Sequence, residues 1–268
     1  MQLRLYKALW GMEGPLADQF ARIAAAGYTG IECGLPEPGQ EQAFKDLLAR
    51  YKFDLIAMVF TAGPDHLASY QRQVERAAAW KPRSITSHSG RDSMSLAQQM
   101  AFFEGALKVD RAAGILVGHE THRGRAFYNP WGTAQVLSAL PELRVVADLS
   151  HWCCVAESLL QDCGPEVALA CERAIHIHGR VGHEHGPQVS DPRAPEFAGH
   201  VAAHEQWWAS IREAHARRGE ASLSFTPEFG PPPYLPVMPY SQAPVADLWD
   251  ICLWMAQRTK ASFQGSRV

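Results

Sequence analysis

The sequence lacks the features that mark several large classes of protein. Its 268 residues carry a formal charge of −3 and no long run of lysine and arginine, so the electrostatic footprint of a nucleic-acid-binding protein is missing. No stretch approaches the ~18 apolar residues that a membrane-spanning helix requires, and the first residues lack the apolar core of a signal peptide. We therefore expect a cytoplasmic protein that binds neither nucleic acid nor a membrane.

The six cysteines lack a functional spacing. No C-x-x-C pair occurs, and the adjacent residues Cys153 and Cys154 have a poor geometry for an ordinary disulfide. In a chain of this size they are typical of reduced, mostly buried thiols in a cytoplasmic protein. This pattern argues against a zinc ribbon or a redox centre.

What the sequence does contain is a regular alternation of short apolar, β-rich runs with longer segments of helical period, which favours βαβ units and a parallel sheet. The helical segments include residues 16–26, 42–51, 66–80 and 95–113. The expected strands are residues 3–9, 30–33, 55–60, 84–87, 115–118, 145–148, 175–178 and 223–226. Eight strands, each followed by a helix, predict a single (β/α)₈ TIM barrel that forms one domain over residues 1–268. An open doubly wound sheet is the alternative, but no glycine-rich phosphate-binding sequence follows the first strand.

Two stretches interrupt the alternation. Residues 179–198 are rich in Gly, Pro, His and Asp, and residues 231–244 are rich in proline. Both follow late strands, so they are expected on the C-terminal face of the barrel, where the active site of this architecture lies. We expect ordered loops beside the mouth of the barrel or a homodimer contact there; plain connecting segments are the third interpretation.

Charged residues fall at the ends of four expected strands. Glu120 and Asp148 follow two apolar runs, His178 ends the alternating segment that begins at Ile175, and Glu228 follows the last strand. Because the C-terminal ends of parallel strands converge around one mouth, we expect two Glu, one Asp and one His to meet there.

Three carboxylates at close range are unstable without a cation, since like charges cannot all remain ionised. Three oxygen ligands and one imidazole suit one divalent ion, Mn²⁺, Zn²⁺, Mg²⁺, Co²⁺ or Fe²⁺, with open positions for substrate or water. A single acidic residue at a strand end is often a helix cap or half of a loop ion pair, but four at successive strand ends favour a metal site. His119 and His176 are expected to be barrel histidines and not ligands.

These segments resemble the xylose isomerase-like TIM-barrel superfamily over nearly the whole chain. Its members include sugar phosphate isomerases and epimerases, ketose 3-epimerases, inosose dehydratases, dehydroshikimate dehydratases and endonuclease IV. The resemblance rests on Glu120, on the D-x-x-H element of Asp148 and His151, on the H-x-H element ending at His178, and on Glu228. Residues 119–125, 183–195 and 226–234 look similar to an uncharacterised bacterial branch of that superfamily.

The resemblance implies that Glu120, Asp148, His178 and Glu228 are the metal ligands and that His151 contacts substrate or supports a ligand. The sequence departs from the family at two positions. Family members often follow the metal-binding His with Lys/Asn-Asp, whereas Gly179 and Arg180 follow His178 here. Ketose epimerases carry a substrate-contacting Glu six residues after the first ligand, where this chain has Ala126.

The resemblance further implies a metal-dependent isomerase or epimerase of a sugar or sugar phosphate, acting by proton abstraction next to a metal-bound carbonyl. Glu120 and Glu228 are then the acid–base pair, with His151 as a third catalytic residue. The expected substrate-binding residues are His122, Arg123, Arg180, Trp10 and Tyr234, with Arg125, Arg193 and Trp131 as weaker candidates. The alternatives are a lyase or dehydratase acting on a keto-sugar or cyclitol, an endonuclease IV-like repair enzyme, and a non-catalytic sugar-binding barrel.

Overall fold

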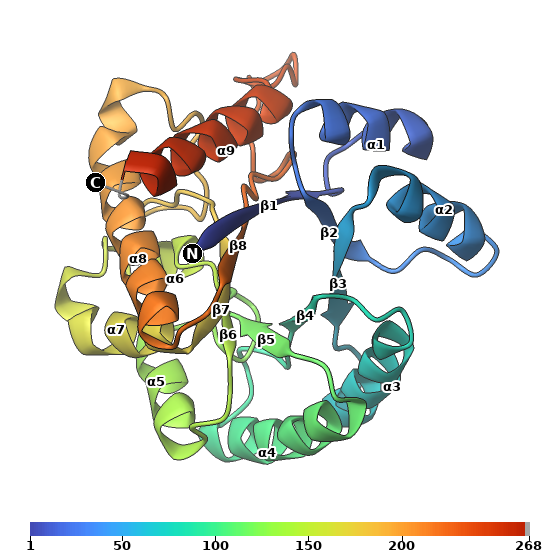
Figure 1. The fold of residues 1–268 in the computed structure, drawn as a ribbon. Coiled ribbons are helices and arrows are strands. Elements are labelled where there is room, and N and C mark those ends of the chain that lie inside the picture. Colours follow the sequence, from blue (N-terminus) through green and yellow to red (C-terminus); the bar gives the residue numbers. More distant parts are fainter. Residues whose placement is uncertain (266–268) are drawn as a thin grey trace.

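The computed structural model describes residues 1–265, and its centre is a closed barrel of eight parallel strands (Figure 1). Each strand pairs with the next one in the sequence, and β1 pairs with β8 to close the barrel. The strands are β1 (Gln2–Ala8), β2 (Gly30–Gly34), β3 (Asp54–Phe60), β4 (Ser84–His88), β5 (Val117–Glu120), β6 (Val145–Ala147), β7 (Ala174–His178) and β8 (Ser222–Thr226). The predicted (β/α)₈ TIM barrel is confirmed.

Helices surround the barrel on its outside (Figure 1). The α-helices are α1 (Leu16–Ala25), α2 (Glu41–Tyr51), α3 (His66–Ala78), α4 (Leu96–Ala113), α5 (Pro130–Ala139), α6 (Ser150–Val155), α7 (Gly164–Arg173), α8 (Ala198–Arg217) and α9 (Leu248–Gly265). Two short 3₁₀ helices, η1 (Gln161–Cys163) and η2 (Pro195–Phe197), precede α7 and α8. None of the helices within residues 1–265 combines the length and the apolar character needed to cross a membrane.

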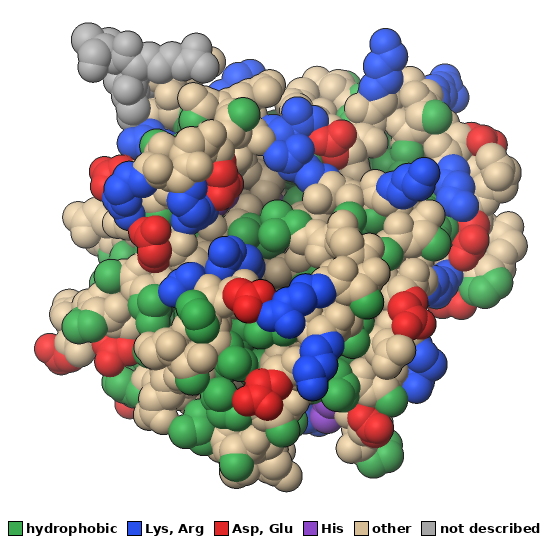
Figure 2. Space-filling view, turned by 60° about the horizontal axis from the view of Figure 1, so that its bottom comes forward, with side chains coloured by type: hydrophobic (Ala, Val, Ile, Leu, Met, Phe, Trp, Pro, Cys, Tyr) green, Lys and Arg blue, Asp and Glu red, His purple; other side chains and the backbone are tan. Residues whose placement is uncertain are grey.

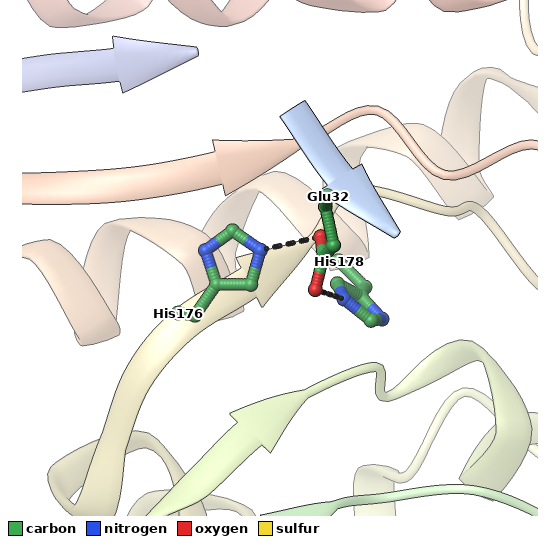
Figure 3. Close-up of side chains that lie close together, drawn as sticks. All are labelled: Glu32, His176 and His178. Atoms are coloured by element: carbon green, nitrogen blue, oxygen red, sulfur yellow. Dashed lines mark hydrogen bonds and ion pairs between the residues drawn. The ribbon is translucent and has the colours of Figure 1, made fainter. Parts of the chain in front are cut away.

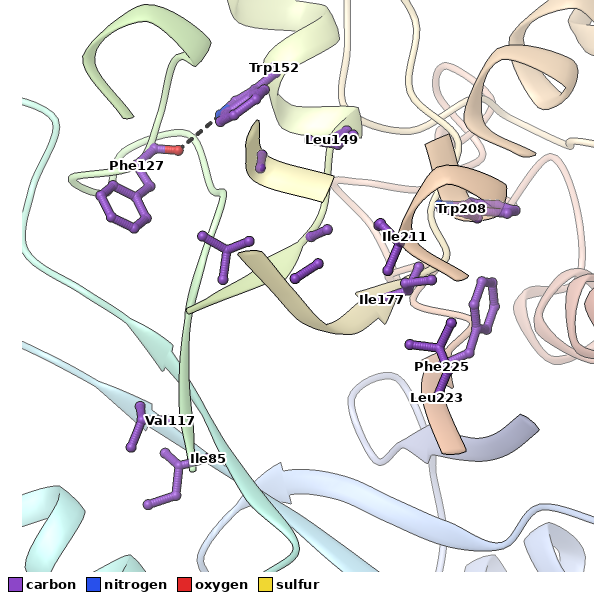
Figure 4. Close-up of a cluster of buried hydrophobic side chains, with 14 of the residues drawn as sticks. Ile85, Val117, Phe127, Leu149, Trp152, Ile177, Trp208, Ile211, Leu223 and Phe225 are labelled. Carbon is purple, nitrogen blue, oxygen red and sulfur yellow. Dashed lines mark hydrogen bonds between the residues drawn. The ribbon is translucent and has the colours of Figure 1, made fainter. Parts of the chain in front are cut away.

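The main core lies between the strands and these helices (Figure 4). Side chains on the outside of β7 and β8 meet α8, where the ring of Trp208 packs edge-on against Phe225 at 5.1 Å. Trp152 of α6 is completely buried and donates its indole N–H to the carbonyl of Phe127 at 3.0 Å. Each such burial contributes roughly 1.5–3 kcal/mol, so the outer layer fixes the strands and therefore the positions of their ends.

The prediction for the fifth strand, residues 115–118, is wrong by two residues. Helix α4 continues to Ala113 and ends at Gly114, which adopts a left-handed conformation with φ 62°. Ile115 and Leu116 lead the chain back to the barrel, and pairing begins at Val117. Glu120 consequently ends β5 instead of following the strand.

The loops after β7 and β8 lie against each other at the mouth of the barrel. Gln188 of the first loop accepts a hydrogen bond from the amide of Gly230 at 2.7 Å and donates one to its carbonyl at 3.1 Å. Gln188 is buried, so these bonds are shielded from water. The loop after β7 therefore contacts the start of the loop after β8 at the mouth of the barrel, where the sequence placed both stretches.

Candidate metal centre and cavity

The four predicted ligands converge at the mouth of the barrel. Glu120 and His178 are the last residues of β5 and β7, Asp148 follows β6 directly, and Glu228 lies two residues after β8. All four are buried, and one ligand-type atom from each lies within 4.8 Å of the others. The parallel topology therefore brings together the residues that the sequence placed at separate strand ends.

Four atoms that face one another in this group lack hydrogen-bond partners in the part of the chain that the structure describes. These atoms are both carboxylate oxygens of Glu120, Oδ2 of Asp148 and Nδ1 of His178. Nδ1 of His178 is 2.8 Å from Glu228 Oε2 and 3.3 Å from Glu120 Oε1. Buried polar atoms without partners are costly, and a divalent cation would satisfy all of them together. The residues therefore fit a divalent metal ion.

Neighbouring groups hold the ligands in this orientation. Ser150 donates from its amide to Oδ1 of Asp148 at 3.2 Å, and also from its hydroxyl, which leaves Oδ2 directed toward the group. The amide of Asp148 donates to the hydroxyl of Thr121 at 2.8 Å. The short helix α6 begins at Ser150, so the turn from β6 into α6 fixes the carboxylate.

Glu32 contacts the candidate metal group and was not identified by the sequence analysis. It lies on β2 and accepts a hydrogen bond from Nε2 of His178 at 3.0 Å (Figure 3). Nδ1 of the same ring faces Glu228 and Glu120. The other bonds to Glu32 come from His176 at 3.1 Å, Thr86 at 2.5 Å and Thr226 at 2.6 Å. The sequence feature that could have identified Glu32 is its charge, because it stands inside an otherwise apolar strand.

The histidines around the group compensate the carboxylates. Burial alone would raise the pKa of Glu120, but the imidazoles of His88 and His178 outweigh burial and hold that pKa well below its usual value. His88 ends β4, and its Nε2 lies 2.5 Å from Glu120 Oε2. Sequence reasoning did not single out His88. Burial would likewise lower the pKa of His178, yet the surrounding carboxylates raise it well above its usual value.

Asp148 behaves differently from Glu120. Burial raises its pKa to about 7, and the charges of Glu228 and Glu120 act in the same direction against the opposing effect of Arg180. The pKa of Glu228 is lowered, because His178 and Arg180 outweigh its burial. The acidic residues therefore differ in their affinity for protons, which is common in sites that perform acid–base chemistry.

Arg180 is a buried cation beside the group. Its Nη2 donates to Glu228 Oε2 at 2.7 Å and lies 3.3 Å from Asp148 Oδ2. The guanidinium also faces the rings of Tyr234, at 4.7 Å, and Trp10, at 5.6 Å. Arg180, predicted to bind substrate, thus contacts two of the proposed ligands directly.

Two further predicted residues, His122 and His151, lie side by side with ring centroids 3.9 Å apart. Burial lowers the pKa of His122 to about 4 and the pKa of His151 well below its usual value, so both rings are neutral at pH 7. Within residues 1–265 the two ring nitrogens of His151 have no hydrogen-bond partner, and its Nε2 is 3.6 Å from Asp148 Oδ2. Nε2 of His122 is 3.4 Å from the hydroxyl of Tyr234.

A cavity of ≈ 400 Å³ opens above this group. Its wall includes four of the predicted substrate-binding residues, namely Trp10, His122, Arg180 and Tyr234, together with the proposed ligand Glu228. The remaining lining residues, which the sequence analysis did not name for this role, are Glu32, Cys33, Gly34, Met58, Phe60 and His88. The wall therefore combines aromatic and apolar surface with a polar floor, as small-molecule sites commonly do.

The other predicted contacts lie farther from the cavity floor. Arg123 is exposed and stacks over Tyr234 at 5.2 Å. Arg125 donates to the carbonyl of Thr61 at 3.1 Å. Arg193 forms a surface ion pair, and Trp131 lies half-exposed at the start of α5.

The two histidines that were predicted to be barrel histidines have interior partners. Nδ1 of His119 lies 2.7 Å from the hydroxyl of Ser89, and His176 contacts Ser224, at 2.7 Å, and Glu32. Burial lowers the pKa of His119 to about 3, so this ring is neutral.

Comparison with known proteins gives matches among solved structures. No family model matches the chain, and no curated protein does. A probable 3-DHS dehydratase involved in petrobactin synthesis from Bacillus anthracis is 13% identical with a TM-score of 0.61, and the match covers 96% of this chain and 98% of that one. 3-keto-D-glucoside 4-epimerase from E. coli is 11% identical with a TM-score of 0.61, covering 97% of this chain and 100% of that one.

A xylose isomerase-like TIM-barrel protein from Mycobacterium smegmatis, solved in complex with magnesium, is 12% identical with a TM-score of 0.57; the match covers 83% of this chain and 85% of that one. The chain therefore has the xylose isomerase-like TIM-barrel fold, as the resemblance implied. A probable dehydratase, an epimerase and an AP endonuclease are among the matched structures, so the fold by itself does not select a reaction.

Proposed function

We propose that this chain is a metal-dependent isomerase or epimerase of a sugar or sugar phosphate. The observation that carries the proposal is the buried group of Glu120, Asp148, His178 and Glu228, whose ligand-type atoms converge below a cavity of small-molecule size. The facing atoms of Glu120, Asp148 and His178 have no hydrogen-bond partner among the described residues. A divalent ion, when bound there, polarises a substrate carbonyl or hydroxyl and makes the adjacent C–H bond more acidic. The magnesium-bound structure of the same fold supports Mg²⁺ as one candidate among Mn²⁺, Zn²⁺, Co²⁺ and Fe²⁺.

The residues around the cavity support a proton-transfer role for this chain. Glu228 lines the cavity, and its lowered pKa keeps it ionised at neutral pH, so it is the group placed to accept a proton from substrate carbon. Glu120 is the second carboxylate of the proposed acid–base pair. The neutral rings of His122 and His151 can each donate or accept a hydrogen bond and are suited to orient substrate hydroxyls.

The wall of the cavity supports a carbohydrate as the substrate. Trp10 and Tyr234 pack edge-to-face at 5.1 Å, and Phe60 is partly exposed. Aromatic faces of this kind can cover the apolar side of a sugar ring, while the polar floor meets its oxygens. Arg180 and the exposed Arg123 are the nearest cations for a negatively charged substrate group.

Solvent hydrogen exchange tests the proposed reaction without knowledge of the product. The metal-loaded protein is incubated in D₂O with a panel of keto-sugars, sugar phosphates and cyclitols, and deuterium incorporation is followed by NMR. We expect deuterium to enter at least one compound, or its C–H bond to break, because isomerisation, epimerisation and elimination share that step. Glu228→Gln should reduce the rate by ~10²–10⁴ because a general base is removed.

The matched control is Glu104→Gln, which changes an exposed carboxylate on α4 and should leave the exchange rate unaltered. Product analysis then separates an isomerase from the runner-up, a lyase or dehydratase, because elimination releases water. Turnover of a panel compound with its C–H bonds intact would overturn the proton-transfer mechanism. Absence of bound metal after purification without chelator would instead favour a non-catalytic sugar-binding barrel.

A further inference from the structure

Arg180 occupies a place where a metal ion would also act. Its guanidinium is 2% exposed and bonds to Glu228 Oε2 and approaches Asp148 Oδ2. The same Glu228 oxygen is 2.8 Å from Nδ1 of His178. One carboxylate oxygen therefore faces both the arginine cation and the proposed ligand nitrogen.

The buried carboxylates need positive charge whether or not an ion is bound. Like charges in a low-dielectric interior repel one another strongly, and an uncompensated carboxylate there is costly. In this structure Arg180 lies against Asp148 and Glu228 and shares the compensation of Glu228 with His178, while His88 lies against Glu120. A divalent ion bound to the same oxygens would compensate carboxylates that Arg180 already compensates, and it would repel the guanidinium.

The surroundings of Arg180 allow its side chain to leave. The guanidinium faces the rings of Trp10 and Tyr234, which border the cavity, and among the described residues Nε and Nη1 form no hydrogen bonds that would be lost on movement. The residue before it, Gly179, packs so closely against Phe225 that an added Cβ would lie 2.0 Å from the ring. The backbone is thus fixed, and the long side chain is the part that can move.

We propose that Arg180 is the internal counterion of the metal-free site and exchanges with the metal ion, releasing Glu228 and Asp148 as the ion binds. This exchange rests on the proposed metal site. It adds that the guanidinium of Arg180 competes with the ion for the carboxylates of Glu228 and Asp148. It has two consequences. The affinity for the ion is lower than the four ligands alone would give, and ion binding moves the guanidinium relative to Trp10.

Isothermal titration of Mn²⁺ into the metal-stripped full chain tests the exchange without any substrate. Arg180→Met should bind Mn²⁺ with a Kd lower by roughly tenfold or more, because the competing cation is gone. Arg180→Lys, which keeps the charge, should remain close to wild type. Arg258→Met is the matched control, since it removes a guanidinium that also faces an aromatic ring, Trp254 at 5.3 Å, but lies on α9 outside the cavity lining, and it should leave the Kd nearly unchanged.

A second measurement follows the movement directly. Titration with Mg²⁺ should change the tryptophan emission of the wild type, and Trp10→Phe or Arg180→Met should remove that change. An Arg180→Met protein that is folded by circular dichroism and binds Mn²⁺ as well as or more weakly than wild type would overturn the exchange. An emission change that persists in Arg180→Met would do the same. Failure of wild type and every variant to bind Mn²⁺ would overturn the metal site itself, a distinct result.

Discussion

Glu32 accepts four hydrogen bonds through one carboxylate, from residues on β4, β7 and β8. Burial would raise its pKa, but His178 and His176 outweigh burial and hold the pKa of Glu32 well below its usual value. The residue therefore stays ionised and fixes the ring of His178 with Nδ1 toward the proposed metal. A carboxylate behind a metal-binding histidine commonly sets both its tautomer and its orientation.

Replacing Glu32 by Gln should weaken ion binding without removing any ligand. The amide cannot accept from the two histidines and the two threonines at once, so His178 loses its fixed orientation. We expect the Kd for Mn²⁺ to rise by about 10–100-fold, measured by isothermal titration. Thr86→Val removes a single donor and should have a smaller effect. An unchanged Kd in a folded Glu32→Gln protein would show that Glu32 does not position His178.

The sequence was sufficient to predict the four residues that converge, because each stands at the end of an apolar run and parallel strands align their ends. Glu32 and His88 were not predicted because their positions do not stand out in the sequence. Glu32 lies within the strand pattern of β2, and His88 ends a run of small polar residues, so neither position differs from ordinary strand residues until the barrel closes. The contact of Arg180 with Glu228 depends on side-chain conformation, which residue spacing does not encode.

At the scale of elements, one buried histidine of α8 forms a hydrogen bond with the loop after β7. His204 of α8 donates from Nδ1 to the carbonyl of His200 at 2.8 Å and accepts at Nε2 from the amide of Gly182 at 3.2 Å. An added Cβ at Gly182 would lie 2.6 Å from the carbonyl oxygen of Ser150, so this loop runs close to α6. The neutral tautomer of His204 thus joins a helix to the segment that follows the ligand His178.

This bond makes stability depend on pH. Burial lowers the pKa of His204 to about 4, whereas an unfolded His titrates near 6.5. A histidine whose pKa is lowered by folding contributes its full stabilisation above pH 6.5. This contribution to the free energy of unfolding is lost as the pH falls from about 6.5 to 4, because the unfolded chain binds the proton first. The loss amounts to at most about 3 kcal/mol.

Urea unfolding between pH 7 and 4.5 measures this dependence. His204→Gln should show a flatter decline in the free energy of unfolding than the wild type. His185→Gln changes an exposed histidine and should retain the wild-type slope. If the free energy of unfolding had the same slope against pH in all three proteins, His204 would be protonated in the folded state as readily as in the unfolded chain.

The order and type of the barrel elements followed from the alternation of apolar and helical periods, and errors were confined to their ends. The fifth strand was misplaced because Ile115 and Leu116 look like strand residues, and only the left-handed turn at Gly114 shows that they connect α4 to β5. The contact between the two mouth loops, through Gln188 and Gly230, joins segments far apart in the sequence, so no local pattern predicts it.

At the scale of the whole molecule, the chain carries 25 Lys and Arg residues against 28 Asp and Glu residues. On the face in Figure 2, Lys and Arg side chains alternate with Asp and Glu and form no continuous basic stripe. The net charge of the chain is −3. A duplex DNA backbone binds proteins chiefly through such basic stripes, so this surface gives it little attraction.

We therefore predict weak, non-specific binding to duplex DNA, with a Kd no tighter than about 10⁻⁶ M at physiological salt. Fluorescence anisotropy of a labelled duplex that contains an abasic site measures the affinity, and gel electrophoresis measures cleavage. Intact DNA is the expected result. Cleavage that Glu228→Gln abolishes would establish a DNA repair enzyme and replace the carbohydrate proposal.

The proposed ion ligands and much of the cavity wall come from different halves of the chain. All four ligands end β5–β8, whereas Trp10, Cys33, Met58 and Phe60 stand at the ends of β1–β3. Recombination between β4 and β5 would thus exchange this part of the wall while preserving the four proposed ligands and the wall residues Arg180 and Tyr234, provided that the incoming half supplies counterparts of Glu32 and His88. We expect such an exchange to alter substrate specificity more than the proposed chemistry.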